Sequence, residues 1–271
     1  MYPTTYRRPT TLAEAKRLFA ESENASFLSG GHTLLPAMKL RLASPSDLID
    51  LGGIPELRGI KLERRVLVIG AATIHADVAA SHLVRQHIPA LAGLAGSIGD
   101  RQVRHRGTIG GSVSNNDPAA DYPSAVLGLD ATVVTDRRRV AADDFFVGLY
   151  ETARAPDEIV IRIEFPIPDI AAYAKFVSPA SRFSIAGVFI AKSGNSVRVA
   201  VTGAGSSGVF RADGLEAALA GDFRPQALAR CKLDPAFMLG DQNGTPEYRA
   251  NLVLVMARRA MENLGAITVY K

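Results

Sequence analysis

Three glycine-bearing stretches of this chain could bring the backbone close to a phosphate group. The first is SGGHT at residues 29–33, directly after a short apolar run. Consecutive glycines adopt dihedral angles that other residues avoid, and they carry no Cβ that would block a ligand. Their N–H groups can then line an anion-binding concavity, to which Thr33 could add a hydroxyl group. A tight turn between a strand and a loop would explain the same residues, so this stretch alone leaves both interpretations open.

The second stretch is RGTIGGSVSNNDPAAD at residues 106–121. Its glycine pair is flanked by Thr108 and Ser112, whose hydroxyl groups suit a pyrophosphate. Asp121 is a short acceptor that suits a ribose hydroxyl. A polar loop that caps the following helix is the alternative. Taken together, the two stretches are similar to the two halves of one diphosphate clamp.

The third stretch, GAGSSG at residues 203–208, matches the G-x-G-x-x-G pattern of dinucleotide-binding folds, and Asp222 lies beyond it. Its surroundings do not match that pattern. The residues VFRADG separate the glycines from the next helical segment, and RPQALARC lacks the character of a buried parallel strand. The sequence therefore predicts a structural turn here, and a Rossmann-type NAD-dependent enzyme is kept as an alternative.

Other reactive groups are scarce. The five histidines show no metal-binding spacing, no G-x-S-x-G elbow is present, and no P-loop lysine follows a G-x-x-x-x-G. The single cysteine, Cys231, excludes an internal disulfide, an iron–sulfur cluster and a cysteine zinc site within this chain. We therefore predict no catalytic side chain and no metal site, which fits a protein whose bound cofactor does the chemistry.

Composition narrows the class of protein further. The 271 residues are 47% hydrophobic and 21% charged, which is typical of a globular chain with a sizeable core. The net charge is only +4, the one tight basic run (136–140) is predicted to be a solvated hairpin tip, and tryptophan is absent, so nucleic-acid binding is not expected. No apolar run approaches the roughly 20 residues of a membrane span, and the first ten residues lack the apolar core of a signal peptide. A cytoplasmic location is the default expectation.

The apolar periodicity predicts the elements that would position these stretches. Thr11 followed by Glu14 has the pattern of a capping box, so a helix is expected from there. Strands are predicted at 25–29, 47–51, 66–72, 131–135 and 158–165, and helices at 76–87 and 89–99. From about residue 170, two apolar strands flank SGN, a hairpin signal, and helical segments follow at 212–221, 225–231 and 246–265. The order of these elements predicts an α+β chain.

Longer motifs give a specific resemblance. The segments SGGHTLLPAMKLR, IGDRQVRHRGTIGGSVSNNDPAADYP and YAKFVSPASRFSIAGVFIAK resemble the FAD-binding medium subunits of molybdenum hydroxylases. The resemblance is closest to the flavoprotein subunit of aerobic carbon-monoxide dehydrogenase, and xanthine dehydrogenase carries a similar domain. It runs in order from about residue 3 onward and includes TGAG and EYRANLVLVMARRAM near the other end.

The resemblance implies a fold and a set of cofactor contacts. The fold would be an FAD-binding domain of the vanillyl-alcohol-oxidase type over residues 1–168, with α+β subdomains of about 1–55 and 56–168, and a small C-terminal α+β flavoprotein domain over 169–271. FAD would be non-covalent, although His32 lies in a loop where some distant flavoproteins attach it covalently. The residues that match cofactor-contacting positions of the family are Leu28, Ser29, Gly30, Gly31, His32, Thr33, Leu34, Leu35, Ile98, Thr108, Ile109, Gly110, Gly111, Ser112, Asp121, Val160 and Lys175.

The resemblance also implies a role. A small subunit with two [2Fe–2S] clusters would deliver electrons, a large subunit with the molybdenum cofactor would oxidise the substrate, and FAD on this chain would pass electrons to a terminal acceptor. A heterotrimer doubled by symmetry is the expected assembly. The alternatives are a self-sufficient flavin oxidase, for which the C-terminal region lacks a substrate domain and catalytic acids, the Rossmann-type enzyme named above, and a cofactor-free scaffold.

Overall fold

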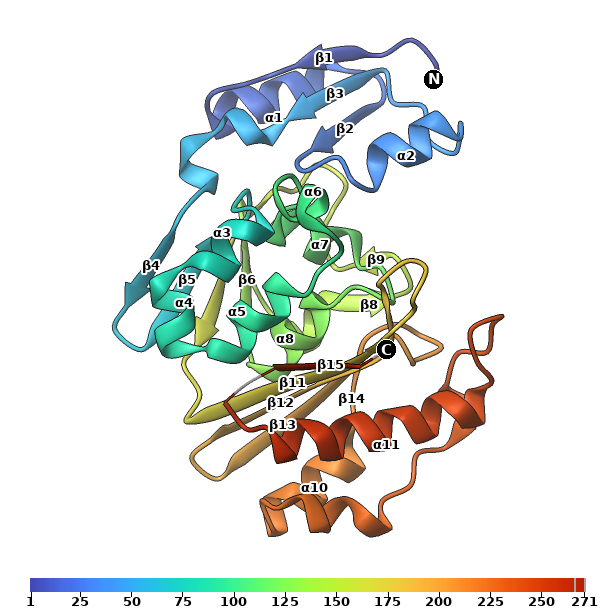
Figure 1. Ribbon diagram of the computed structural model, residues 1–271. Coiled ribbons are helices and arrows are strands. Elements are labelled where there is room, and N and C mark those ends of the chain that lie inside the picture. The colour runs from blue at the N-terminus through green and yellow to red at the C-terminus, as the bar shows by residue number, and fades with distance from the viewer. Residues whose placement is uncertain (266, 271) are drawn as a thin grey trace.

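The computed structural model describes residues 1–265 and 267–270 and confirms the α+β class (Figure 1). Three sheets follow one another along the chain. The first lies within residues 5–50, the second within 60–166 and the third within 170–270. A separate two-stranded hairpin lies between the last two strands of the second sheet in the sequence.

The N-terminal sheet is parallel, in the order β1-β3-β2. Its elements are β1 (Thr5–Arg7), α1 (Leu12–Glu21), β2 (Ala25–Leu28), α2 (Leu34–Lys39) and β3 (Asp47–Asp50), followed by 3₁₀ turns at 51–53 and 55–57. The predicted cap at the start of α1 is present, because the Thr11 hydroxyl accepts a hydrogen bond from the Glu14 N–H at 3.2 Å. The Glu14 carboxylate accepts in return from the N–H of Thr10, one residue earlier than a standard capping box would have it.

The second sheet is antiparallel, in the order β4-β5-β10-β6-β7. Its strands are β4 (Ile60–Glu63), β5 (Val66–Gly70), β6 (Thr132–Thr135), β7 (Arg139–Ala141) and β10 (Val160–Pro166). The helices between them are α3 (His75–Ala80), α4 (His82–His87), α5 (Pro89–Gly96), α6 (Arg101–Arg104), α7 (Ile109–Asn115), α8 (Tyr122–Gly128) and α9 (Ala142–Phe145). The isolated hairpin is β8 (Phe146–Gly148) with β9 (Glu151–Thr152). The basic run at 136–140 lies at the β6–β7 turn, as predicted.

The C-terminal sheet has the order β14-β13-β12-β11-β15, and only β15 runs parallel to its neighbour. Its elements are β11 (Ile170–Val177), β12 (Ser184–Ser193), β13 (Ser196–Thr202), β14 (Phe210–Arg211), α10 (Asp213–Gly221), α11 (Pro246–Glu262) and β15 (Ile267–Tyr270), with 3₁₀ turns at 225–230 and 235–237. Helices α10 and α11 cover one face of the sheet, and α5 and α8 pack on the other (Figure 1). The C-terminal sheet therefore packs directly against α5 and α8, which belong to the segment of the second sheet.

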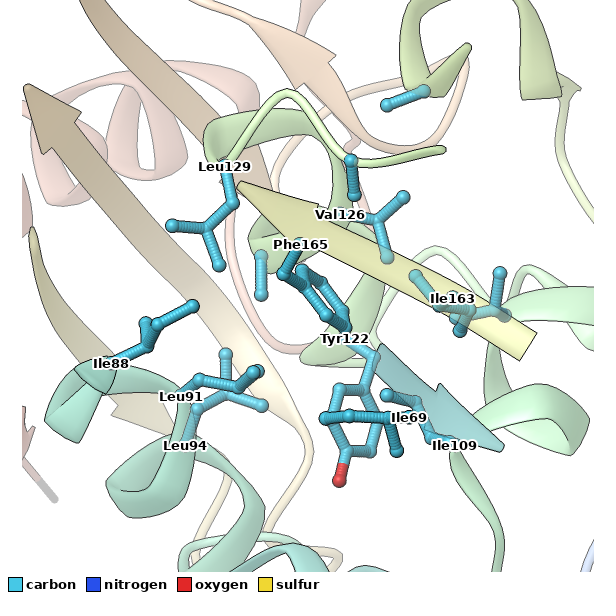
Figure 2. Close-up of a cluster of buried hydrophobic side chains, with 14 of the residues drawn as sticks. Ile69, Ile88, Leu91, Leu94, Ile109, Tyr122, Val126, Leu129, Ile163 and Phe165 are labelled. Atoms are coloured by element: carbon cyan, nitrogen blue, oxygen red, sulfur yellow. The ribbon is translucent and has the colours of Figure 1, made fainter. Parts of the chain in front are cut away.

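The largest apolar core lies between the second sheet, its helices and the inner face of the C-terminal sheet. Figure 2 shows its centre, where Tyr122 and Val126 of α8 pack against Ile163 and Phe165 of β10. Ile109, the second residue of the TIGG motif, is buried in the same cluster. This core fixes the start of α7, and so it also fixes the second glycine stretch.

Three local predictions differ from the structure. The helix predicted over 76–87 is divided at Ser81, whose hydroxyl caps the second helix by accepting from Val84 N–H, a role that serine favours. The segment 225–230 is a 3₁₀ helix. The polar stretch after Thr108 is helical from Ile109 to Asn115 rather than a loop, and Asn116 ends that helix in a left-handed conformation.

Candidate functional site

A cavity of about 750 Å³ lies where the N-terminal sheet, the helices and loops of residues 71–121, the 150–160 segment and the 181–183 loop meet. This volume is in the usual range for a ligand site. Fourteen of the predicted site residues line it, which are Leu28, Ser29, Gly30, Gly31, His32, Thr33, Leu34, Ile98, Thr108, Gly110, Gly111, Ser112, Asp121 and Val160. Both glycine stretches thus meet at one cavity although they are distant in the sequence.

The other three predicted residues lie behind the lining. Leu35 packs its side chain against Gly31, where an added Cβ would lie 2.9 Å from Leu35 Cδ1. Ile109 and Lys175 are both fully buried. These residues support the wall from outside the cavity rather than forming it.

The first glycine stretch is shaped by close approach of two loops. The chain leaves β2 at Leu28, and Gly30 then lies directly against the backbone of Arg106 and Gly107. A Cβ on Gly30 would lie 2.6 Å from the Cα of Gly107, which is closer than real Cβ atoms come. Gly31 has φ +76°, a conformation that glycine adopts freely. Gly30 is therefore required by the close approach of two loops, and Gly31 by its positive φ angle.

The same stretch leaves backbone donors free. Within residues 1–265 and 267–270, no acceptor is present for the N–H groups of Gly30, Gly31, His32 and Thr33. Consecutive unpaired N–H groups at a turn form a concavity that binds anions. This arrangement fits the diphosphate of a dinucleotide, because it supplies several neutral donors at one turn of the cavity wall.

The two glycine amides of the second stretch are already paired within the protein. The Gly110 N–H donates to the carbonyl of Ala71 at 2.9 Å, and the Gly111 N–H donates to the Thr108 hydroxyl at 3.1 Å. These two amides are therefore not available to a diphosphate. Gly110 is required for packing instead, since an added Cβ would lie 2.7 Å from the Ala71 carbonyl oxygen.

A hydroxyl bridge connects the two stretches. Ser29 Oγ and Thr108 Oγ1 lie 2.8 Å apart, within hydrogen-bond distance. Because Thr108 Oγ1 already accepts from Gly111, its own proton can be donated to Ser29. The Ser29 proton is then free for a ligand oxygen. In this way Thr108 positions Ser29 on the cavity wall.

Asp121 is the centre of a buried polar network. Its carboxylate lies 3.0 Å from Lys175 Nζ through each oxygen, and it also accepts from the hydroxyls of Tyr173 at 2.5 Å and Ser184 at 2.9 Å. Burial, followed by the Asp121 charge, raises the pKa of Tyr173, so that this hydroxyl stays protonated and donates. Asp121 was interpreted from the sequence as a ribose acceptor. The structure gives it protein donors instead, and it joins α8 to strands β11 and β12.

Several residues that line the cavity were not predicted from the sequence, because they belong to no glycine stretch or spaced motif. His75 begins α3 and is 5% exposed, and its Nδ1 is buried without a partner in the described chain. Burial, and then the charges of His32 and Arg104, lower the pKa of His75 to about 4, so its imidazole is neutral at pH 7. Phe19 and Phe27 stack at 4.6 Å and also line the cavity, as does the half-exposed Phe183. Lone histidines and aromatic residues in apolar patterns are indistinguishable from core residues in a sequence.

Glu158 is a buried carboxylate on the cavity wall. Burial alone would raise its pKa, but hydrogen bonds from Arg138, Thr135 and the Ala155 N–H outweigh that effect and hold the pKa at about 2. A carboxylate with a lowered pKa stabilises the fold above its unfolded pKa of 4.5, and this contribution is lost as pH falls toward 2.

We therefore expect Glu158→Gln to lower the free energy of unfolding by about 3 kcal/mol at pH 7, and by progressively less between pH 4.5 and pH 2. Urea unfolding of both proteins across this pH range measures the difference. Asp157→Asn, at the neighbouring exposed carboxylate, is the control and should change stability less. A difference as large at pH 3 as at pH 7 would show that Glu158 does not stabilise the fold through its charge.

The GAGSSG segment is a structural turn, as predicted. It follows β13, which is antiparallel to both its neighbours, whereas a Rossmann fingerprint follows a parallel strand. Gly203 has φ +81°, its N–H donates to the Pro118 carbonyl, and its carbonyl accepts from the buried Arg249. The segment anchors the C-terminal sheet to the loop after α7.

Comparison with known proteins decides the family. Residues 2–168 match the family model described as the FAD-binding domain in molybdopterin dehydrogenase. This chain belongs to that family. Because this domain is an FAD site and the cavity supplies a fitting cradle, the chain is a flavoprotein of the molybdenum-hydroxylase class.

Relatives of the family match over nearly the whole chain. The carbon monoxide dehydrogenase medium chain of Hydrogenophaga pseudoflava is 36% identical, over 94% of this chain and 95% of that protein. The nicotine 6-hydroxylase medium subunit of Paenarthrobacter nicotinovorans is 33% identical, over 97% and 98%. A solved carbon monoxide dehydrogenase from Hydrogenophaga pseudoflava superposes with a TM-score of 0.84 at 34% identity, covering 96% of both chains. The recognised family and the expected class of oxidoreductase subunit are therefore confirmed.

The described residues were also compared with the requirements of a membrane span and of a metal site. No helix in the described part of the chain is long and apolar enough to cross a bilayer. Among the same residues, no group of three or more histidine, cysteine or acidic side chains could hold a metal ion.

Proposed function

We propose that the cavity holds FAD non-covalently and that this chain relays electrons from a [2Fe–2S] subunit to a terminal acceptor. The observation that carries the proposal is the first glycine stretch, where four backbone N–H groups have no acceptor within the described part of the chain and the backbone of Arg106 and Gly107 leaves no room for a side chain at Gly30. When bound, FAD accepts and releases electrons singly or in pairs, so it can connect one-electron and two-electron carriers.

Of the seventeen residues predicted from the sequence, we propose that the fourteen that line the cavity contact the cofactor. Residues 28–34 hold the diphosphate through the backbone and Ser29. Ile98, Val160 and Asp121 all line the cavity, and Ile98 and Val160 offer apolar walls to the flavin. Leu35, Ile109 and Lys175 act from behind the wall. His75 adds a neutral imidazole, which can donate or accept one hydrogen bond without adding charge.

Substrate oxidation is assigned to a separate chain. The relatives are named as medium chains or subunits, which supports a multi-subunit assembly here. We propose a small iron–sulfur subunit and a large molybdenum subunit as partners, in a heterotrimer doubled by symmetry, located in the cytoplasm. Within this chain we propose domain boundaries near residues 55 and 168, where the three sheets are separated.

Co-expression with its partner chains tests this role. A tag on this chain should recover flavin, iron and molybdenum together, and the isolated chain should bind FAD yet show no flavin reduction with organic substrates. Absorbance in the flavin bands and metal analysis measure both results. An isolated chain that reduces its flavin with an organic substrate would be the self-sufficient oxidase, and the relay would be wrong.

A further inference from the structure

Arg154 is a half-buried arginine on the cavity wall, in the segment between β9 and β10. One end of its guanidinium is fixed, because Nη1 donates to the carbonyls of Ala155, Pro156 and Glu158 at 2.8, 3.0 and 2.9 Å. Within the described part of the chain, Nε is buried without a partner and no acceptor lies within hydrogen-bond distance of Nη2. The side chain is therefore held in one orientation with donors that the protein leaves unused.

The positive charge of Arg154 has no counter-charge of its own in the protein. Among residues 1–265 and 267–270, no carboxylate lies within 4.0 Å of its guanidinium. The Glu158 carboxylate is already paired with Arg138 at 3.1 Å, and the Asp157 carboxylate is paired with Arg137. Burial lowers the pKa of Arg154, and the charges of Glu158 and Asp157 oppose this effect only in part. An anion bound beside Arg154 would supply the missing counter-charge.

The rest of the cavity wall supplies little positive charge. Among the described lining residues, the only other arginine or lysine is Arg182, which is exposed in the 181–183 loop. The first glycine stretch offers neutral N–H groups, and the His75 imidazole is neutral at pH 7. A diphosphate is an anion, and hydrogen bonds to it are stronger when the donor is itself charged. Arg154 is therefore the cation best placed to balance a phosphate in this cavity.

Arg154 and the first glycine stretch are supported by the same apolar cluster. The segment that carries Arg154 leads into Ile159, which packs in one cluster with Phe27, and Phe27 leads through Leu28 to Gly30. We propose that Arg154 binds a phosphate oxygen of FAD, a proposal that rests on the FAD site proposed above. The glycine stretch then supplies close approach and neutral donors, and Arg154 supplies the positive charge. A guanidinium suits this role because its planar array of N–H groups matches phosphate oxygens.

The test titrates FAD into the full-length chain after its flavin has been removed. We expect Arg154→Met to bind FAD about 10- to 100-fold more weakly, as for loss of a hydrogen bond to a charged group. The loss should shrink as salt is added, because salt screens the attraction that only the wild type has. Arg154→Lys keeps the charge and should recover part of the affinity and of its salt dependence. The matched control is Arg258→Met in α11, at another half-buried arginine with an unpartnered Nε, which does not line the cavity. It should bind FAD as the wild type does.

Two fragments of FAD separate a phosphate contact from a general loosening of the site. In Arg154→Met, binding of ADP, which carries the diphosphate, should weaken as much as binding of FAD, and binding of riboflavin, which has no phosphate, should stay at the wild-type level.

Wild-type FAD affinity in Arg154→Met overturns the proposal, and so does a loss that is equally large for riboflavin or unchanged by salt. If Arg154→Met does not fold, Arg154→Gln, which keeps a donor for the carbonyls without the charge, gives the same comparisons. Wild type that binds no FAD contradicts the proposed function itself and is seen before any variant is compared.

Discussion

Gly30→Ala should release FAD while the protein remains folded. The new Cβ would lie 2.6 Å from the Cα of Gly107 and against the carbonyl of Arg106, and neither backbone group can move away as a flexible side chain could. The two loops must therefore separate. The N–H groups from Gly30 to Thr33, which have no acceptor within the described chain, then no longer point toward one bound anion. We expect FAD affinity to fall at least about 100-fold, which corresponds to about 2.7 kcal/mol of binding free energy.

FAD titration and the flavin-to-protein ratio after gel filtration measure this effect. The control is Gly214→Ala in α10, where an added Cβ meets no atom within 4 Å and alanine favours the helix. Gly110→Ala gives a second comparison: because its Cβ would strike Ala71 in the core, it should lower thermal stability before it affects the cofactor. Stoichiometric FAD in folded Gly30→Ala would show that the first glycine stretch is only a turn.

The two glycine stretches show what sequence reasoning can and cannot reach. Adjacent glycines after a strand predicted a place where backbone approaches something closely, and both stretches do lie at the cavity. The sequence could not tell what is approached. For Gly110 it is Ala71, a residue of another element whose carbonyl also takes the Gly110 N–H. Hydrogen-bond partners between distant segments depend on tertiary packing, which no local pattern encodes.

Asp121 illustrates the same limit for charged residues. Its place in a polar stretch was interpreted as an acceptor for a ribose hydroxyl, and its partner Lys175 lies 54 positions away in the sequence. The pairing of these two residues depends on how the C-terminal sheet packs on α8. His75 and Glu158 were missed for a related reason, because burial and unpaired atoms become visible only in three dimensions. The resemblance to a family supplied positions such as Ile98 and Val160 that composition and spacing did not.

Lys175→Met should destabilise the protein strongly and lower the flavin reduction potential. Lys175 is 0% exposed and pairs with an Asp121 carboxylate that is also buried. Removing one partner of a buried pair leaves an uncompensated charge, which costs about 3–5 kcal/mol of folding free energy. At about 2–4 °C per kcal/mol, the melting temperature should fall by roughly 10 °C. The unbalanced negative charge at the cavity wall would also disfavour electron uptake by the nearby flavin.

A double-mutant cycle separates this charge effect from lost packing. Lys175→Met/Asp121→Asn removes both charges, so it should recover most of the stability and most of the reduction potential that Lys175→Met loses. If the two sites were independent, the losses of stability from the two single substitutions would instead add. Lys61→Met, in an exposed ion pair with Glu63, is the control and should change stability by less than about 1 kcal/mol. Thermal unfolding and a redox titration of the bound flavin give the two readouts. If the loss of unfolding free energy in the double variant equals the sum of the losses in the two single variants, Lys175 and Asp121 contribute independently. In that case the charges of the buried pair do not link the cofactor site to the C-terminal sheet.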